Sequence, residues 1–292
     1  LKRGNLVEKL TGRIFAETRY DWANVGAALT ERGVVLLDSP VRPTDSLDWQ
    51  GEVRGLSPLG IRYLIATDYH GDHTTGASFI EDEVTFISPQ VVFDEFSKGD
   101  NAFSKEIFTK TLEDRGLAEE ARQITDAPVP LPDVCFEDSM TLHLEPLTFE
   151  IRRLGGHSPA TSMIFIPEEG VIFASDIVIN EPCPGLRDAN VQEWIDALSF
   201  IEDLPADRVV PGHGPIGGMK EVGELKEYLT TVLGKMKALA AEGREKGEAV
   251  SDPFFDQFFW TDTSRGEYWI QQRKDTFRGG LGRVFDEAKG AR

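Results

Sequence analysis

Short apolar segments with buried or alternating character fill the first 90 residues and predict strands. Residues 25–29 and 33–40 form two such segments, joined by the turn sequence "ERG", and Asp38 stands near the end of the second. Residues 62–68, "RYLIATD", form another buried strand that ends on Asp68. Loops at strand ends often carry functional side chains, because a rigid sheet fixes them and solvent can reach them. The pattern therefore predicts a sheet with carboxylates at its strand ends.

A change of periodicity predicts helices further along the chain. Residues 91–125 have helix-like spacing and many charges, and the three prolines of "DAPVPLPD" end this segment. We expect a helical excursion over about residues 91–133, laid over the sheet. Alternation then returns, and "TSMIFIPEEGVIFASD" predicts a hairpin that turns at "PEEG".

Two helices are predicted after the hairpin. Asn190 and Glu193 resemble a capping box for a helix that begins near residue 191. A long amphipathic helix follows, with apolar residues spaced three and four apart: Val222, Leu225, Leu229, Val232, Met236 and Leu239.

Composition limits the classes of function. The 292 residues are 40% hydrophobic, which suits one large domain or two small ones. No stretch is apolar enough to span a membrane, and the first residues lack a signal-peptide pattern, so we expect a cytoplasmic protein. The net charge of −19 disfavours nucleic acid and anionic membranes as partners. We expect Cys135 and Cys183 to be small buried residues, since neither belongs to a paired motif.

Potential metal ligands gather in four segments. The stretch "ATDYHGDHTTG", residues 66–76, contains two aspartates and two histidines within six positions, and Asp68 opens the series. Two more of the five histidines lie in the glycine-containing segments "GGHSP" and "PGHGP", and Asp176 ends the buried strand of "FASDIV". Imidazole and carboxylate groups bind divalent metals, and neighbouring glycines give an ion unhindered access.

The order of these residues resembles the five-motif signature of the metallo-β-lactamase superfamily. The matching positions cover about residues 12–216 and are Asp38, Asp68-x-His70-x-Asp72-His73, His157, Asp176 and His213. The resemblance implies an α+β fold, a four-layer αβ/βα sandwich with a two-metal site at one edge of its sheets. Residues 1–216 would then be the catalytic domain, and residues 217–292 a helical, aromatic-rich extension packed on it.

The resemblance also implies a role for each residue. Asp68, His70 and His157 would bind a first divalent ion, and Asp72, His73 and His213 a second. Asp176 would bridge the two ions, and Asp38 would support the ligands by hydrogen bonding.

Asp68 departs from the common pattern, which has histidine at this position. A carboxylate makes the ligand set more anionic and favours harder ions, so manganese or iron are alternatives to zinc. Zinc remains an equal candidate, because carboxylate is an ordinary zinc ligand. A third alternative is a first site so weakened that the protein works with one metal or none.

Such a site supports hydrolysis. We predict that a metal-bridging hydroxide attacks a small-molecule ester, lactone, thioester or amide, with Asp72 and Asp176 as catalytic residues. Non-haem iron oxidoreductase chemistry of the dioxygenase kind, and a catalytically retired binding protein, are the alternative functions.

Several other residues could belong to the site by their position in the chain. We expect His143 to lie on the solvent face of a strand and Tyr69 to point into the core. Ser158, Thr161 and Ser162 could line the pocket, but they lack the setting of a nucleophilic serine.

The last 40 residues are rich in aromatic side chains. Core packing, a homodimer interface and a cover for the pocket mouth are the three alternatives for this tail, core packing being the commonest fate of aromatics. The residues are Phe254, Phe255, Phe258, Phe259, Trp260, Tyr268, Trp269 and Phe277.

Overall fold

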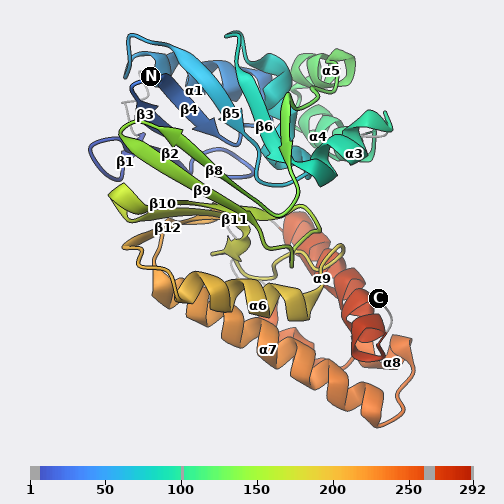
Figure 1. Ribbon diagram of the computed structural model, residues 1–292. Coiled ribbons are helices and arrows are strands. Elements are labelled where there is room, and N and C mark those ends of the chain that lie inside the picture. The colour runs from blue at the N-terminus through green and yellow to red at the C-terminus, as the bar shows by residue number, and fades with distance from the viewer. Residues whose placement is uncertain (1–6, 100–101, 260–266, 291–292) are drawn as a thin grey trace.

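The computed structural model describes residues 7–99, 102–259 and 267–290 (Figure 1). Its first sheet has seven strands among these residues, hydrogen-bonded in chain order. Strands β1 to β4 are antiparallel, and β4 to β7 are parallel. They are β1 (Glu8–Lys9), β2 (Ile14–Glu17), β3 (Val25–Thr30), β4 (Gly33–Leu37), β5 (Ile61–Ile65), β6 (Thr85–Pro89) and β7 (Val134–Phe136).

The second sheet has five strands among the described residues, in the order β12-β11-β10-β9-β8. Neighbouring strands are antiparallel except β11 and β12, which are parallel, with register shifts on either side of Ser175. The strands are β8 (Ser139–Leu144), β9 (Leu147–Arg153), β10 (Ser162–Ile166), β11 (Val171–Ile179) and β12 (Arg208–His213).

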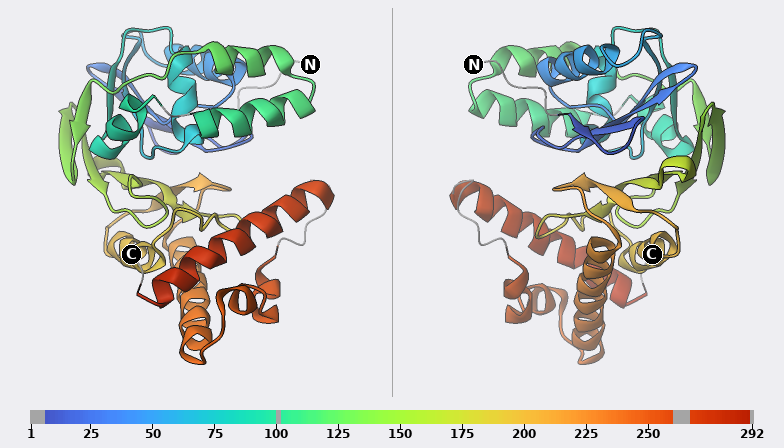
Figure 2. Two further views of the ribbon diagram at one scale, coloured as in Figure 1. Left: turned by 90° about the vertical axis from the view of Figure 1, so that its right-hand side faces the viewer. Right: turned by 90° about the vertical axis from the view of Figure 1, so that its left-hand side faces the viewer.

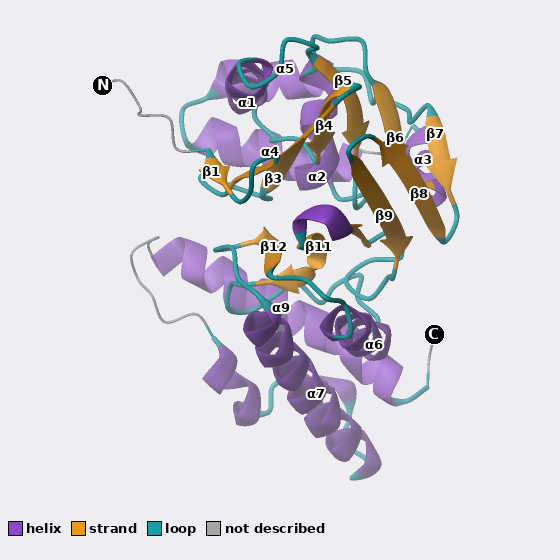
Figure 3. Cartoon of the chain, turned by 60° about the vertical axis from the view of Figure 1, so that its left-hand side comes forward, coloured by secondary structure: helices purple, strands orange, loops and turns teal. Residues whose placement is uncertain are grey.

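Alternating side chains explain why the two sheets stack. In β4, Val35 and Leu37 face the second sheet, whereas Val34 and Leu36 face helix α1 (Pro43–Arg54), where Trp49 is fully buried. The outer face of the second sheet is covered by α6 (Val191–Glu202) and α7 (Met219–Ala241). Figure 3 shows the two sheets between these helical layers. The predicted α+β fold and four-layer sandwich are confirmed.

The remaining helices form two groups. A helical segment follows β6 and contains α3 (Gln90–Ser97), α4 (Ala102–Asp114) and α5 (Ala118–Asp126), as the excursion over residues 91–133 predicted. After α7 come α8 (Lys246–Val250), the 3-10 helix η3 (Pro253–Phe258) and α9 (Glu267–Ala288). Figure 2 shows α4 and α9 extending from the same side of the molecule. None of the helices in the described part of the chain is long and apolar enough to cross a membrane.

The finer predictions of strands and helices are confirmed as well. The hairpin of β10 and β11 turns through the 3-10 helix η2 (Pro167–Glu169). The Asn190 side chain caps α6 by accepting a hydrogen bond from the Glu193 amide at 3.1 Å. All six apolar residues predicted along the long helix are buried in α7.

The aromatic tail packs on the domain where it is described. Phe255 and Phe277 are fully buried in the core cluster that contains α6 and α7, and Phe254, Phe258 and Phe259 pack against this cluster. Core packing therefore accounts for these five residues. Trp260 and the side chains of Tyr268 and Trp269 lie outside the described part, and a dimer interface or a pocket cover stays a prediction.

Candidate metal centre

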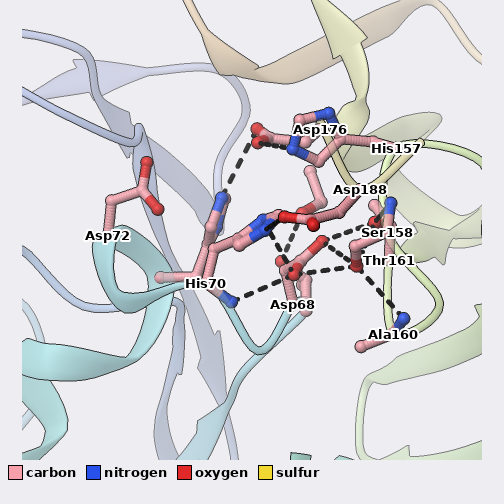
Figure 4. Close-up of polar contacts among 12 residues, drawn as sticks. Asp68, His70, Asp72, His157, Ser158, Ala160, Thr161, Asp176 and Asp188 are labelled. Carbon is pink, nitrogen blue, oxygen red and sulfur yellow. Dashed lines mark hydrogen bonds and ion pairs between the residues drawn. The ribbon is translucent and has the colours of Figure 1, made fainter. Parts of the chain in front are cut away.

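The predicted ligands meet at one edge of the two sheets. The motif from Asp68 to His73 follows β5 and continues into helix α2 (Gly71–Thr74), which leads into the 3-10 helix η1 (Thr75–Phe79). His157 lies in the β9–β10 loop, Asp176 on β11, and His213 at the end of β12. Because these ends lie side by side, residues far apart in sequence come together (Figure 4).

Two groups of side chains could each hold a metal ion. His70, His157 and Asp176 form the first ligand group, and Asp72, His73 and His213 form the second. Within each group the potential ligand atoms lie within 4.8 Å of one another.

Asp176 lies between the two groups. Its Oδ2 is 3.2 Å from His157 Nε2, and its Oδ1 is 3.3 Å from His213 Nε2. The same Oδ1 is 3.4 Å from His73 Nε2, and Asp72 Oδ2 is 3.2 Å from His213 Nε2. Asp176 is therefore placed to contact ions in both groups.

These separations fit shared metal ligands better than hydrogen bonds. Charge-assisted N–H···O bonds are about 2.7–2.9 Å long, whereas two atoms each bonded to one tetrahedral zinc at about 2.0–2.1 Å lie roughly 3.3 Å apart. In addition, His73 Nε2 and Asp176 Oδ1 are buried and have no hydrogen-bond partner among the described residues. Such orphaned buried atoms are rare in folded proteins, and a divalent cation would satisfy both. The donor set therefore fits metal ions.

Asp38 makes hydrogen bonds of ordinary length and holds a histidine in place. It is 5% exposed and sits at a positive φ of 57° just after β4. Its carboxylate accepts from the Thr67 amide at 2.8 Å and from the Thr67 hydroxyl at 2.6 Å, and lies 2.8 Å from His73 Nδ1. A proton held on Nδ1 leaves Nε2 of His73 free to bind a metal. This geometry agrees with the supporting role expected for Asp38.

Asp68 is placed differently from the expectation. It is fully buried and lies outside both ligand groups. Ser158 and Thr161 donate hydrogen bonds to its carboxylate, and the backbone amide of His70 donates another at 3.0 Å. Its assignment as a metal ligand stays a prediction, and Ser158 and Thr161 are buried partners of Asp68 instead of pocket walls.

Two residues missed by the sequence reasoning support the histidines. Asp188, in the loop before α6, has its Oδ2 3.2 Å from His70 Nε2 and 3.4 Å from Arg187. Trp194 of α6 packs edge-on against the His157 ring, with ring centroids 5.0 Å apart, and its indole donates to the Ile177 carbonyl at 2.7 Å. The capping signal at Asn190 located this helix, but no local pattern places it against His157.

Close packing around the ligands depends on two glycines. A Cβ on Gly212 would lie 1.9 Å from Asp176 Oδ1, so only glycine leaves room for this carboxylate beside β12. Gly156, before His157, has a φ of +95°, and a Cβ there would lie 2.6 Å from Cα of Trp194. Both positions therefore need a residue without a side chain.

The many carboxylates raise the pKa values of three of the histidines, His70, His73 and His213. Burial alone would lower the pKa of His70, but Asp68 and Asp188 raise it to about 9. Burial also opposes the effect at His213, where Asp176 and Asp72 raise the pKa to about 10. The site thus stabilises positive charge, either as protons on imidazole or as bound cations. Because metal binding requires neutral imidazole, an ion would displace these protons.

The remaining candidates lie outside the ligand groups. His143 is exposed on β8, as predicted. Tyr69 is partly buried against the cluster of Val92, Phe96 and Ala160, in agreement with a packing role, although its ring also contacts His70. Ser162 is buried and bonds the Ala160 carbonyl. Cys183 is buried, as expected, and its thiol donates to the Phe258 carbonyl at 2.7 Å, whereas Cys135 is partly exposed and the expectation of burial was wrong for it.

Comparisons with known proteins agree with this geometry. The family model described as "Metallo-beta-lactamase superfamily" matches residues 23–213. A metallo-beta-lactamase type 2 from Bacteroides fragilis is 22% identical over 204 residues, which cover 68% of this chain and 71% of that protein. A linear primary-alkylsulfatase from Pseudomonas sp. is 20% identical over 220 residues, or 66% of this chain but only 42% of that protein.

A similar solved structure extends the likeness of the fold to the C-terminal helices. A metallo-beta-lactamase family protein from Thermus thermophilus superposes with a TM-score of 0.67 at 17% identity. The superposition covers 97% of this chain and 96% of the Thermus chain. At this identity the likeness concerns the fold alone. Since the family model matches well over half of the 292 residues, the chain belongs to the metallo-beta-lactamase superfamily.

Proposed function

We propose that this protein is a metal-dependent hydrolase that acts on a small-molecule ester, lactone, thioester or amide. The observation that carries the proposal is the pair of adjacent ligand groups that share Asp176. Two divalent ions bound there would lower the pKa of a shared water molecule and stabilise the negative charge that develops on the attacked group.

Asp72 is suited to bind an ion and to accept a proton. Burial would raise its pKa, but the hydrogen bond from His213 and the charge of His73 lower it well below the usual range of aspartate. The carboxylate is therefore ionised at neutral pH, and it is partly exposed at the start of α2. From this position it can hold an attacking water or receive its proton.

Asp188 in the loop before α6 contacts His70, and Val92 and Phe96 of α3 pack near Tyr69, so this loop and the helical segment that α3 begins are the parts that would select the substrate. The relatives named above include a β-lactamase and an alkylsulfatase, so a β-lactam and an alkyl sulfate belong beside carboxylic esters and lactones in a substrate panel. Superfamily membership alone does not choose among these bonds.

The proposal is tested on metal-stripped protein reconstituted separately with Zn²⁺, Mn²⁺ or Fe²⁺. We expect hydrolysis of at least one substrate in the panel after reconstitution, and its loss in Asp176→Asn. The matched control is Asp196→Asn, which changes an exposed carboxylate on α6. Oxygen consumption that requires iron, without hydrolysis, would replace the proposal by the oxidoreductase alternative. Tight ligand binding by metal-free protein would replace it by a binding role.

A further inference from the structure

The carboxylate of Asp68 is hydrogen-bonded to Ser158 and Thr161, and its Oδ1 lies 3.3 Å from Nδ1 of His70. Figure 4 shows it directed at Ser158 and Thr161 and separated from Asp72. An aspartate side chain is shorter than the histidine that usually stands at this position, and Asp68 is not part of the group that His70 forms with His157 and Asp176. Asp68 is the member of the expected ligand set that neither group contains among the described residues.

Most of the hydrogen-bonding capacity of Asp68 is already used. An ionised carboxylate has about four acceptor positions. Oδ1 accepts from the His70 amide at 3.0 Å, and Oδ2 accepts from the Ser158 hydroxyl at 2.9 Å and from Thr161. His70 Nδ1 lies a further 3.3 Å from Oδ1. A metal ion at Asp68 would compete with these partners at a fully buried position.

These partners come from the two loops that carry the histidines of the first ligand group. The His70 amide belongs to the motif after β5, whereas Ser158 and Thr161 follow His157 in the β9–β10 loop. Asp68 therefore connects the two loops, and the rings of His70 and His157 lie with their centroids 5.0 Å apart. Backbone bonding supports the same junction, since the Ser162 amide donates to the Thr67 carbonyl at 2.8 Å.

We infer that Asp68 is a positioning residue, which fixes His70 and His157 at the separation that metal binding needs and does not itself bind metal. The first ligand group then has three protein ligands, one of them the shared Asp176. The second group keeps Asp72, His73 and His213 in addition to Asp176 and binds its ion more tightly. This inference rests on the proposed metal-dependent function and adds the unequal affinity of the two sites.

The test is a double-mutant cycle read out as zinc affinity, by competition with a chelating dye. The first variant (arm) is Asp68→Asn, and the second is Ser158→Ala with Thr161→Val. A third variant combines all three substitutions. Each arm should lower the affinity for the weaker ion by about 10–100-fold, the usual effect of losing a group that orients a ligand. Because the two hydroxyl groups act through Asp68, the combined variant should lose no more affinity than Asp68→Asn alone.

Reference variants identify the two ions. His157→Ala should remove the weaker ion, and His213→Ala the tighter one. If Asp68→Asn removes the weaker ion as completely as His157→Ala does, Asp68 acts as a ligand and the inference is wrong. Circular dichroism of each variant checks that the fold is kept.

A crystal structure of the zinc-bound wild-type protein decides the question without any variant. Both Asp68 oxygens should lie beyond the bonding distance of about 2.0–2.2 Å from either ion. An oxygen within that distance would overturn the inference and leave the proposed function in place. A wild-type protein that binds no divalent ion overturns the proposed function, and the inference with it.

Discussion

Replacing Asp38 by asparagine should weaken metal binding while the protein stays folded. The Thr67 amide can only donate, so the new side chain would keep its carbonyl oxygen there, at the 2.8 Å contact of the native carboxylate. The amide nitrogen then takes the place of Oδ2, next to the Thr67 hydroxyl and His73 Nδ1. Thr67 can accept this hydrogen bond because its own hydroxyl can donate to Ser175 at 2.7 Å.

His73 determines the size of the effect. An amide donor at Nδ1 forces the imidazole proton onto Nε2, the atom that faces Asp176 Oδ1 at 3.4 Å. A protonated nitrogen cannot bind an ion, so zinc affinity should fall by about 10–100-fold. The free energy of unfolding of the metal-stripped protein should fall by a similar amount, about 1–3 kcal/mol, since one charge-assisted hydrogen bond becomes a neutral one.

Asp38→Ala is the matched comparison for the stability effect. It leaves the Thr67 amide and His73 Nδ1 without a buried acceptor, at about 1–3 kcal/mol each, so it should unfold at clearly lower urea concentration. Zinc affinity is measured by chelator competition, with the exposed Asp196→Asn as the control. Wild-type zinc affinity in Asp38→Asn would refute the reasoning, because the tautomer of His73 would then not depend on Asp38.

Further predictions concern packing and charge. Gly156→Ala should lower the melting temperature and the zinc affinity together, because its Cβ would meet Trp194 at 2.6–3.0 Å. Asp188→Asn should lower the pKa of His70 from about 9 in metal-stripped protein, as followed by NMR titration; an unchanged pKa would contradict the assigned contact. Because the pKa of His70 is raised on folding, its stabilisation of the metal-stripped protein is complete below about pH 6.5. Urea unfolding should show this stabilisation lost as the pH rises through about 9. Phe277→Ala should cost about 3–5 kcal/mol in urea unfolding, since the ring is fully buried, and a cost below about 1 kcal/mol would show that the tail does not stabilise the domain.

The periodicity of apolar residues predicted the strands and helices in which the spacing along the chain determines which side chains are buried. Val34 to Leu37 alternate between the two faces of one strand, and the apolar residues of α7 repeat every three or four positions. Each pattern follows directly from the geometry of a strand or a helix and needs no knowledge of the partner.

The ligand set could be predicted because the motif fixes residue types at fixed positions on strand ends. The motif did not indicate in which direction each side chain points or which residues it contacts. The sequence places Asp68 two residues before His70, but the side chain turns to Ser158 and Thr161, about 90 positions away. Asp188 shows the same limit, since only the folded loop before α6 brings it to His70.

The measurement that tests the central claim most directly is the metal content per chain of the tag-free wild-type protein and of Asp176→Asn, by elemental mass spectrometry after incubation with Zn²⁺, Mn²⁺ or Fe²⁺. The shared position of Asp176 between both ligand groups predicts up to two ions per wild-type chain, and a marked loss from both sites in the variant. A wild-type chain without bound metal, or a variant that keeps its full complement, would contradict the account.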